Sequence, residues 1–311
     1  MLTDFSGHKD IARAIHDTAY EYRKLGRYDK ADQLDQYVID HWPIDVQAMW
    51  AKMDMAKTDI WLGNDAAAQE AINNLIADFS DNPDLPEAVF AIGEQYYYKA
   101  FDDPDRCTIV KSQDHLNKAK HIWERIIAQW PQSQSIGLKH AYYFSAVCYH
   151  KLGEHTKAAE YFQKVVDDYP AYQYAWSAQC LIGECYEKLR DSGVLSESEA
   201  NPKIEESYIA VIEKYPDSSV AAHAHLQLAN MKSQANQWAE AAAYFESFLE
   251  KYPQDKRYTR VLYDLGRAYE RMGELERAAE IYRILTEILG PEDSRIETVR
   301  ANLKKLEGAQ K

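Results

Sequence analysis

Apolar and polar residues follow helical spacing along almost the whole chain, and this pattern is cut at regular intervals. At each cut an aromatic residue or a glycine precedes a proline, which blocks a helix because proline disfavours helical geometry in the residue before it. Successive cuts lie roughly 37 to 51 residues apart, the period of an array of two-helix repeats. The cuts, with a weaker one at Phe79-Ser80, are Trp42-Pro43, Trp130-Pro131, Tyr169-Pro170, Tyr215-Pro216, Tyr252-Pro253 and Gly290-Pro291.

Small residues recur midway along the first expected helix of each segment, and a second one follows twelve positions later where the segment is uninterrupted. Small side chains allow two antiparallel helices to approach closely, and larger apolar residues fill the remaining volume. The pairs are Ala19 and Ala31, Ala56 and Ala68, Gly93 and Ala119, Ala146 and Ala158, Ala229 and Ala241, and Gly266 and Ala278. A further segment has Gly183, with Ile204 at the partner position.

Aromatic residues and glycines keep the same phase. One aromatic follows the first small residue by three positions, at Tyr22, Tyr96, Tyr149, Tyr186 and Tyr269. Another follows the second small position by four, at Trp123, Phe162, Tyr208, Phe245 and Tyr282. Glycine marks the turn between the two helices at Gly26, Gly63, Gly153 and Gly273, where it can form a left-handed cap.

This set of residues resembles the tetratricopeptide repeat, most clearly in Ala141 to Pro170 (AYYFSAVCYHKLGEHTKAAEYFQKVVDDYP) and in Val261 to Pro291. The resemblance covers nearly the whole chain as seven copies, which begin near residues 12, 49, 86, 139, 176, 222 and 259. It implies an all-α fold, a single right-handed α-α superhelix (solenoid) of about seven helix-turn-helix repeats over residues 1–311. The Tyr-Pro ending is similar to bacterial arrays of cell-envelope proteins, such as TolA-binding proteins and outer-membrane assembly lipoproteins.

Two copies carry polar, helix-breaking insertions between their helices, at about residues 101–114 and 190–202. Both should project from the same edge of the array, either as tolerated surface loops or as a second contact site. After the last cut, residues 294–308 form one more helical pattern, in which Ile296, Val299, Leu303 and Leu306 share a face. We expect this helix to cover the core of the last repeat as a terminal cap.

Composition and charge narrow the classes of function. The hydrophobic content of 46% is enough for a substantial core, and the formal net charge of -14 opposes binding to nucleic acid or to anionic membranes. No apolar run approaches the ~20 residues of a membrane span. The four cysteines form no C-x-x-C pair, and a disulfide framework is not expected at this size.

No sequence motif of a catalytic or nucleotide-binding site is present. His223 and His225 are two residues apart, which places them on different faces of a helix, and His150 and His155 straddle the Gly153 turn. We therefore expect no metal site, no cofactor and no enzymatic activity.

The family resemblance implies that the first helix of each repeat lines a concave groove, at the second, fifth, ninth, twelfth and thirteenth positions of each copy. Steps of three and four residues stay on one helix face, which agrees with this assignment. The residues that we expect to bind a peptide or protein there are Arg23, Trp50, Met53, Lys57, Trp61, Phe90, Glu94, Tyr97, Tyr143, His150, Arg260, Tyr263 and Arg267. The alternative for the aromatic residues among them is that some of the rings pack between neighbouring helices. Further residues at these positions include Tyr20 of the first copy and Asn230, Ser233 and Gln234 of the sixth.

Both ends of this predicted wall are basic, with Arg13, Arg23 and Lys24 at one end and Arg260, Arg267 and Arg271 at the other. Such a wall could receive an acidic peptide or a terminal carboxylate. The alternative is that these cations pair with neighbouring acidic residues such as Asp264 and Glu270.

The sequence thus favours a non-catalytic scaffold that binds a peptide or protein segment in its groove. Two alternatives stay open: a self-assembling structural module that forms homo-oligomers, and a regulatory segment of a larger protein. Residues 1–9 are polar and lack the hydrophobic region of a signal peptide. The protein is expected in the cytoplasm if Met1 is its native start, and in the periplasm or cell envelope if a leader was removed.

Overall fold

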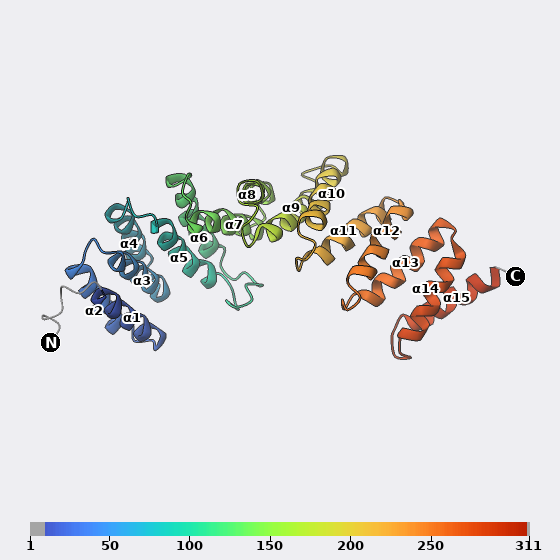
Figure 1. The fold of residues 1–311 in the computed structure, drawn as a ribbon, viewed down its shortest axis with the longest axis horizontal. Coiled ribbons are helices and arrows are strands. Elements are labelled where there is room, and N and C mark those ends of the chain that lie inside the picture. The colour runs from blue at the N-terminus through green and yellow to red at the C-terminus, as the bar shows by residue number, and fades with distance from the viewer. Residues whose placement is uncertain (1–9, 310–311) are drawn as a thin grey trace. The chain divides into compact units, whose positions relative to one another are not determined.

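The computed structural model describes residues 10–309, and the polar segment 1–9 lies outside them. Within that range the chain is built from α-helices and has no β-strand, which confirms the expected all-α class (Figure 1). Backbone contacts divide the chain into two compact units, with the boundary between Tyr172 and Gln173. The prediction of a single solenoid over 1–311 stays a prediction.

The first unit consists of four antiparallel helix pairs. Within each pair the two helices pack against each other along their length. The helices are α1 (Ile11–Lys24), α2 (Tyr28–His41), α3 (Val46–Leu62), α4 (Asp65–Asp78), α5 (Leu85–Lys99), α6 (Gln113–Gln129), α7 (Ile136–Lys151) and α8 (His155–Asp168).

The second unit consists of three helix pairs and a final helix. Its helices are α9 (Ala175–Asp191), α10 (Glu197–Lys214), α11 (Ala221–Gln234), α12 (Trp238–Lys251), α13 (Tyr258–Met272), α14 (Leu275–Ile288) and α15 (Ile296–Ala309). The final helix α15 packs on α14, with Ile296, Val299 and Leu306 buried in the core of the unit.

The aromatic-proline pairs end the second helices as expected. The aromatic residue is the C-cap of its helix at Trp42, Trp130, Tyr169, Tyr215 and Tyr252. At each of these positions the backbone N–H still donates to a carbonyl four residues earlier, whereas the following proline has no N–H to donate. The helix therefore stops at the aromatic residue and the chain turns toward the next repeat.

The small residues and the second set of aromatics turn out to be packing partners. A Cβ atom on Gly183 would come within 2.9 Å of the Tyr208 ring, and one on Gly266 within 2.7 Å of the Tyr282 ring. Gly93 stands in the same relation to the indole of Trp123, whose Nε1 donates to the Phe90 carbonyl at 3.1 Å. Glycine at these positions of the first helix therefore makes room for a large ring from the second helix.

The first set of aromatics forms a repeated contact as well. Each tyrosine of the first helix lies under a cation from the second helix of the same pair, within the range of a cation–π interaction. The distances from cation to ring centroid are 5.7 Å for Lys30 over Tyr22, 5.7 Å for Lys118 over Tyr96, 5.1 Å for Lys157 over Tyr149, 4.8 Å for Lys203 over Tyr186 and 4.2 Å for Arg277 over Tyr269.

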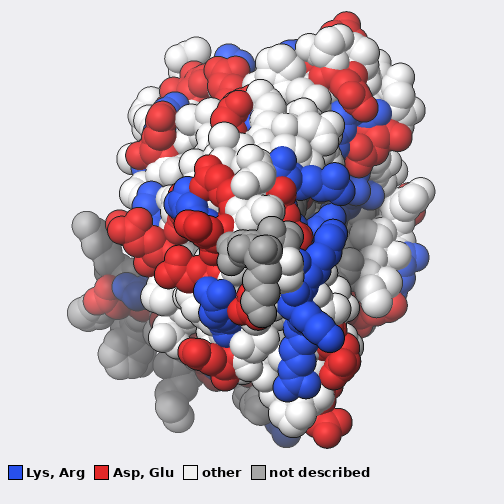
Figure 2. All heavy atoms as spheres, turned by 90° about the vertical axis from the view of Figure 1, so that its right-hand side faces the viewer, with Lys and Arg blue, Asp and Glu red and all other residues white. Residues whose placement is uncertain are grey.

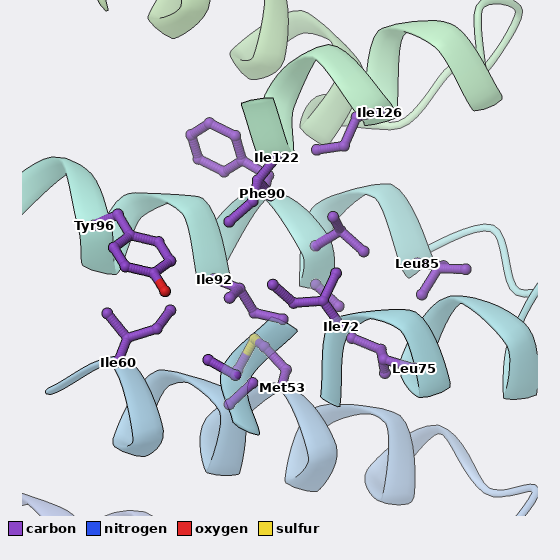
Figure 3. Close-up of a cluster of buried hydrophobic side chains, with 14 of the residues drawn as sticks. Met53, Ile60, Ile72, Leu75, Leu85, Phe90, Ile92, Tyr96, Ile122 and Ile126 are labelled. Carbon is purple, nitrogen blue, oxygen red and sulfur yellow. The ribbon is translucent and has the colours of Figure 1, made fainter. Parts of the chain in front are cut away.

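The core of the first unit lies between successive helix pairs. In Figure 3, Ile72 of α4 lies beside Ile92 of α5 and near Met53 of α3, and Leu75 continues the cluster along α4. Phe90 and Ile122 continue the same cluster toward α6. Because each pair buries its apolar face on the next one, the fold depends on the neighbouring repeats.

The first insertion is anchored to the unit by a buried aromatic residue and by contacts with α7. Phe101 is fully buried and forms an isolated antiparallel bridge with Val110, so the loop closes at its base. Lys151 of α7 donates to the Cys107 carbonyl at 3.1 Å, and its Nζ lies 5.1 Å from the centre of the Phe101 ring. These contacts fix the loop against the following repeat.

The second insertion is helical over most of its length, so the expectation that it breaks the helices is wrong there. Helix α9 continues to Asp191 and α10 begins at Glu197, with Pro202 inside it. Ser196 and Glu199 form a capping box that starts α10. Pro202 lies in the second turn of this helix, so the helix lacks the hydrogen bond that an N–H there would donate to the carbonyl four residues earlier. The prediction that both insertions project from one edge stays a prediction.

Candidate functional site

In each unit, side chains of the first helices line an open pocket. We call this first-helix surface the inner wall. In the first unit α1, α3 and α5 contribute most of a pocket of 330 Å³, lined by Tyr20, Arg23, Lys24, Tyr28, Asp54, Lys57, Thr58, Trp61 and Gln95. In the second unit α9, α11 and α13 contribute most of a pocket of 440 Å³, lined by Glu187, Arg190, Ile204, Gln227, Asn230, Met231, Ser233, Gln234, Trp238, Phe245, Arg260, Asp264 and Arg267.

Two exposed aromatic residues line the first pocket. The side chain of Trp61, in the last turn of α3, is 55% exposed, and that of Tyr20 on α1 is 52% exposed. Lys57 lies one turn before Trp61 and forms an ion pair with Asp54 at 3.5 Å. Burial raises the pKa of Glu94, and the positive charge of Lys57 opposes that rise. Trp61, Lys57 and Tyr20 therefore bring apolar, cationic and hydroxyl groups to one surface.

Three of the aromatics predicted to line the groove are core residues. Phe90 stacks on Trp123 and on His140, with ring centroids 5.3 Å and 4.9 Å away. Tyr97 packs edge-on against Phe101 at 5.0 Å. Both rings are buried, and so are Tyr143, which packs against Phe144 and Phe162, and the Met53 side chain.

The prediction that these four side chains present a surface to a partner is therefore wrong. Their repeat positions do lie on the first helix, but neighbouring first helices pack against each other, as α3 does with α5 and α5 with α7. Large rings at those positions are therefore enclosed between the helices, where a partner cannot reach them.

Two further predicted residues are half-buried. Trp50 packs against the hydrophobic core of the first unit. The His150 ring lies 5.1 Å from the His155 ring, across the turn between α7 and α8. The contribution of either residue to partner binding stays a prediction.

Arg23 belongs to a buried network of charges. Its guanidinium forms ion pairs with the fully buried Asp35 and, at 2.8 Å, with Asp32, and its Nε donates to Thr58 Oγ1 at 3.0 Å. His16 Nδ1 lies 2.9 Å from the other oxygen of Asp35. This network ties α1 and α2 to α3, so Arg23 serves the fold and its charge is already compensated.

The predicted residues of the second unit remain on the surface. Arg260 is exposed and pairs with Asp264 at 2.9 Å, one turn along α13, while the exposed Arg267 lines the same pocket. Tyr263 is half-buried, with its ring 6.2 Å from that of Tyr282. Figure 2, which faces the C-terminal helices, shows Lys and Arg side chains gathered in a band with clusters of Asp and Glu around it.

Comparison with known sequences agrees with the repeat pattern. Two family models described as Tetratricopeptide repeat match residues 232–303 and 140–172. These two stretches are therefore tetratricopeptide repeats. No curated protein matches the sequence.

Solved structures of tetratricopeptide-repeat proteins are similar to this chain at low sequence identity. The C-terminal part of such a protein from Cytophaga hutchinsonii is 15% identical, with a TM-score of 0.54 over 82% of this chain and 88% of that one. Proteins from Parabacteroides merdae (12% identity, TM-score 0.41, 95% of this chain and 98% of that one) and Thermus thermophilus (19%, 0.36, 71% and 98%) are also similar. The Cytophaga hutchinsonii structure supports the arrangement of helix pairs.

Tetratricopeptide repeats suggest a protein-interaction scaffold, because stacked helix pairs create extended surfaces for other proteins.

Two aromatic residues of the second pocket, Trp238 and Phe245, were not among the predicted inner-wall residues. They lie on α12, a second helix, whereas the prediction considers only the first helix of each repeat. Within residues 10–309, no helix combines the length and hydropathy that a membrane span requires.

The structure also brings together three possible metal ligands, although the sequence predicts no metal site. The Cys180 thiol and the Glu184 carboxylate on α9 meet the His223 imidazole on α11, and their ligand atoms all lie within 4.8 Å of one another. His223 and His225 do point to different faces, as expected, but the ligand partners of His223 come from another helix.

Proposed function

We propose that this chain is a non-catalytic scaffold that binds a segment of a partner protein along the inner wall of its repeats. The observation that carries the proposal is that both pockets are lined mainly by first helices, which come from three successive repeats in each unit. A segment bound there would contact several repeats at once, as the stacked surfaces of repeat proteins allow.

In the first unit, Trp61 is the candidate anchor for the partner. Its large exposed ring lies beside Lys57 and Tyr20 in the same pocket. Aromatic rings of this kind contribute most when a partner removes them from water, at about 2 kcal/mol or more for a central residue. We therefore expect an apolar partner side chain on Trp61, flanked by a group that accepts hydrogen bonds from Lys57.

In the second unit, the pocket favours an acidic segment. Arg190, Arg260 and Arg267 bring three guanidinium groups to it, against the two carboxylates of Glu187 and Asp264. The Gln227 amide donates to Glu187 at 3.2 Å, and the Asn230 amide also lines the pocket. The Arg260–Asp264 pair is a surface pair, with the Arg260 side chain 69% exposed, and such pairs contribute little to stability. Arg260 can therefore exchange its partner for a carboxylate of the bound segment, which it would hold in a bidentate hydrogen bond.

The proposal is tested in two steps. Crosslinking followed by mass spectrometry identifies partners of the wild-type protein in cells, and a purified partner or peptide is then titrated against the wild type, Trp61→Ala and Arg267→Ala. Leu62→Ala is the matched control, because Leu62 is also exposed, at 57%, and does not line the pocket. We expect Trp61→Ala to weaken binding by at least about 30-fold, corresponding to 2 kcal/mol, and Leu62→Ala to leave it unchanged.

Equal affinity of all these variants would contradict inner-wall binding. Light scattering over a range of concentrations completes the test. A mass that rises with concentration, and that no inner-wall substitution reduces, would favour self-assembly over partner capture.

A further inference from the structure

Two groups that can bind a metal lie one helical turn apart on α9. Cys180 and Glu184 are four residues apart, so their side chains leave the same face of this helix. Cys180 is buried, at 2% exposure, whereas the Glu184 side chain is 35% exposed and reaches the surface. A thiolate and a carboxylate with this spacing can bind one ion together.

The third group comes from α11 of the same unit. His223 Nε2 lies 3.8 Å from Glu184 Oε1, and the sulfur of Cys180 completes a set in which every pair of ligand atoms lies within 4.8 Å. Bond lengths of about 2.0–2.3 Å to a tetrahedral zinc ion place its ligands about 3.3–3.8 Å apart. Side-chain rotations that move the ligand atoms by about 1 Å would therefore bring the three groups to these distances around an ion.

The polar atoms of this cluster are poorly satisfied by the protein itself. His223 Nε2 is buried, and no described residue makes a hydrogen bond to it. Burial lowers the pKa of His223, with a smaller effect from Arg257, and it therefore keeps the imidazole in the neutral form that binds metals. An unpaired buried nitrogen costs free energy, which a bound cation would recover.

The surrounding charge also favours a cation. Burial, and then the negative charge of Glu187, raise the pKa of Glu184. Burial, followed by Glu184 and Glu187, raises the pKa of the Cys180 thiol to about 12. Lys188 and Arg190, which lower the carboxyl pKa values of Glu184 and Glu187 respectively, only partly offset this negative charge. A bound divalent ion would lower the pKa of both Glu184 and Cys180.

We infer that Cys180, Glu184 and His223 form a binding site for a transition-metal ion of the zinc type on the inner wall of the second unit. On binding, the Cys180 thiol loses its proton to solvent and forms a metal–sulfur bond, Glu184 binds through one carboxylate oxygen and His223 through Nε2. One sulfur, one nitrogen and one oxygen ligand suit Zn²⁺ and Co²⁺ rather than Mg²⁺ or Ca²⁺.

Three protein ligands leave a fourth coordination position for water or for a group of another molecule. Glu187 and Gln227, which line the 440 Å³ pocket, lie one turn beyond Glu184 and His223 on the same helices. The open position is thus near the pocket of the second unit. The site stands independently of the proposed partner binding, because the metal alone is its ligand.

The experiment uses the full chain purified without a histidine tag and titrated with Co²⁺ in the reduced state. We expect one equivalent to produce a thiolate-to-cobalt charge-transfer band and visible bands of a tetrahedral ion, both removed by Zn²⁺ and unaffected by Mg²⁺. Zn²⁺ should also raise the midpoint of thermal unfolding, and Mg²⁺ should not.

Variants assign the ligands. Cys180→Ser should abolish the charge-transfer band, and His223→Gln should weaken Co²⁺ binding by more than the roughly 10–100-fold loss that follows removal of an outer partner. Cys107→Ser and His121→Gln are the controls, because Cys107 lies in the first insertion and His121 is exposed on α6. Both should bind Co²⁺ like the wild type.

Absence of the band at stoichiometric Co²⁺, or wild-type affinity of His223→Gln, would overturn the inference. If Cys180→Ser does not fold, X-ray absorption of the zinc-loaded Cys107→Ser protein decides instead. One sulfur with nitrogen and oxygen neighbours supports the site, and a shell without sulfur refutes it.

Discussion

Gly266 on α13 lies directly against the ring of Tyr282 on α14, so closely that a Cβ atom on the glycine would come within 2.7 Å of Tyr282 Cε1. The ring cannot easily move, because it is fully buried and its hydroxyl donates to Glu270 at 2.9 Å. The same relation joins Gly183 to Tyr208. In both pairs the absence of one methyl group sets how closely the two helices pack.

Gly266→Ala should therefore destabilise the protein by about 1–3 kcal/mol, the usual cost of overpacking a core. This loss exceeds the gain of up to about 1 kcal/mol that alanine brings inside a helix. Urea denaturation followed by circular dichroism measures the difference. Gly290→Ala is the control, because a Cβ there meets no atom within 4 Å. A Gly266→Ala protein as stable as the wild type would show that the two helices separate freely.

Arg23→Met should cost about 3–5 kcal/mol, because it leaves the fully buried Asp35 without its main counter-charge. Arg13→Met, at a side chain that is 70% exposed, should change the free energy of unfolding by less than about 0.5 kcal/mol. The double variant Arg23→Met/Asp35→Leu should regain part of the loss, since no isolated charge then remains buried. A small effect of Arg23→Met alone would instead leave Arg23 as a candidate for partner binding.

Trp61→Ala and Phe90→Ala should separate the binding surface from the core. The Phe90 ring is 5% exposed, and its removal should cost about 3–5 kcal/mol in free energy of unfolding. Trp61 is 55% exposed, so its removal should leave the helical circular dichroism intact and change stability by less than about 0.5 kcal/mol. Chemical denaturation of both variants checks this, and strong destabilisation by Trp61→Ala would place that ring in the core.

His225 should make the protein less stable toward acidic pH. Its Nδ1–H donates to the Ala221 carbonyl at 3.0 Å, and Nε2 lies 3.2 Å from Ser247 Oγ, which suits a neutral imidazole that accepts from the hydroxyl. Burial, and to a smaller degree Lys251, lower the pKa of His225 in the folded protein. Below about pH 6.5 the unfolded chain therefore binds more protons than the folded one, and the free energy of unfolding falls as the pH falls.

The test for His225 compares slopes. In His225→Gln, the free energy of unfolding should decline less steeply between pH 7 and pH 5 than in the wild type. Measurement at pH 8, where the imidazole is neutral in both states, isolates the packing loss of the substitution. Parallel slopes for the two proteins would contradict the assignment of a buried neutral imidazole.

The roles of individual wall residues depended on information that the sequence does not carry. The sequence placed Phe90 and Trp61 alike on first helices at positions expected to face a groove. The structure buries Phe90 between Trp123 and His140 and leaves Trp61 exposed, because the depth of a position depends on how closely successive first helices approach. That approach depends on all the side chains between them.

The sequence by itself determined the all-α class, the helix pairs and where most of them end. These features follow from local rules, because the backbone geometry before Pro43 or Pro170 and the helical spacing of apolar residues act within a few neighbours. The tertiary structure alone decided that Arg23 pairs with Asp35 and that His223 meets Cys180 and Glu184. These contacts join residues on different helices, so their distances follow from how the helices pack.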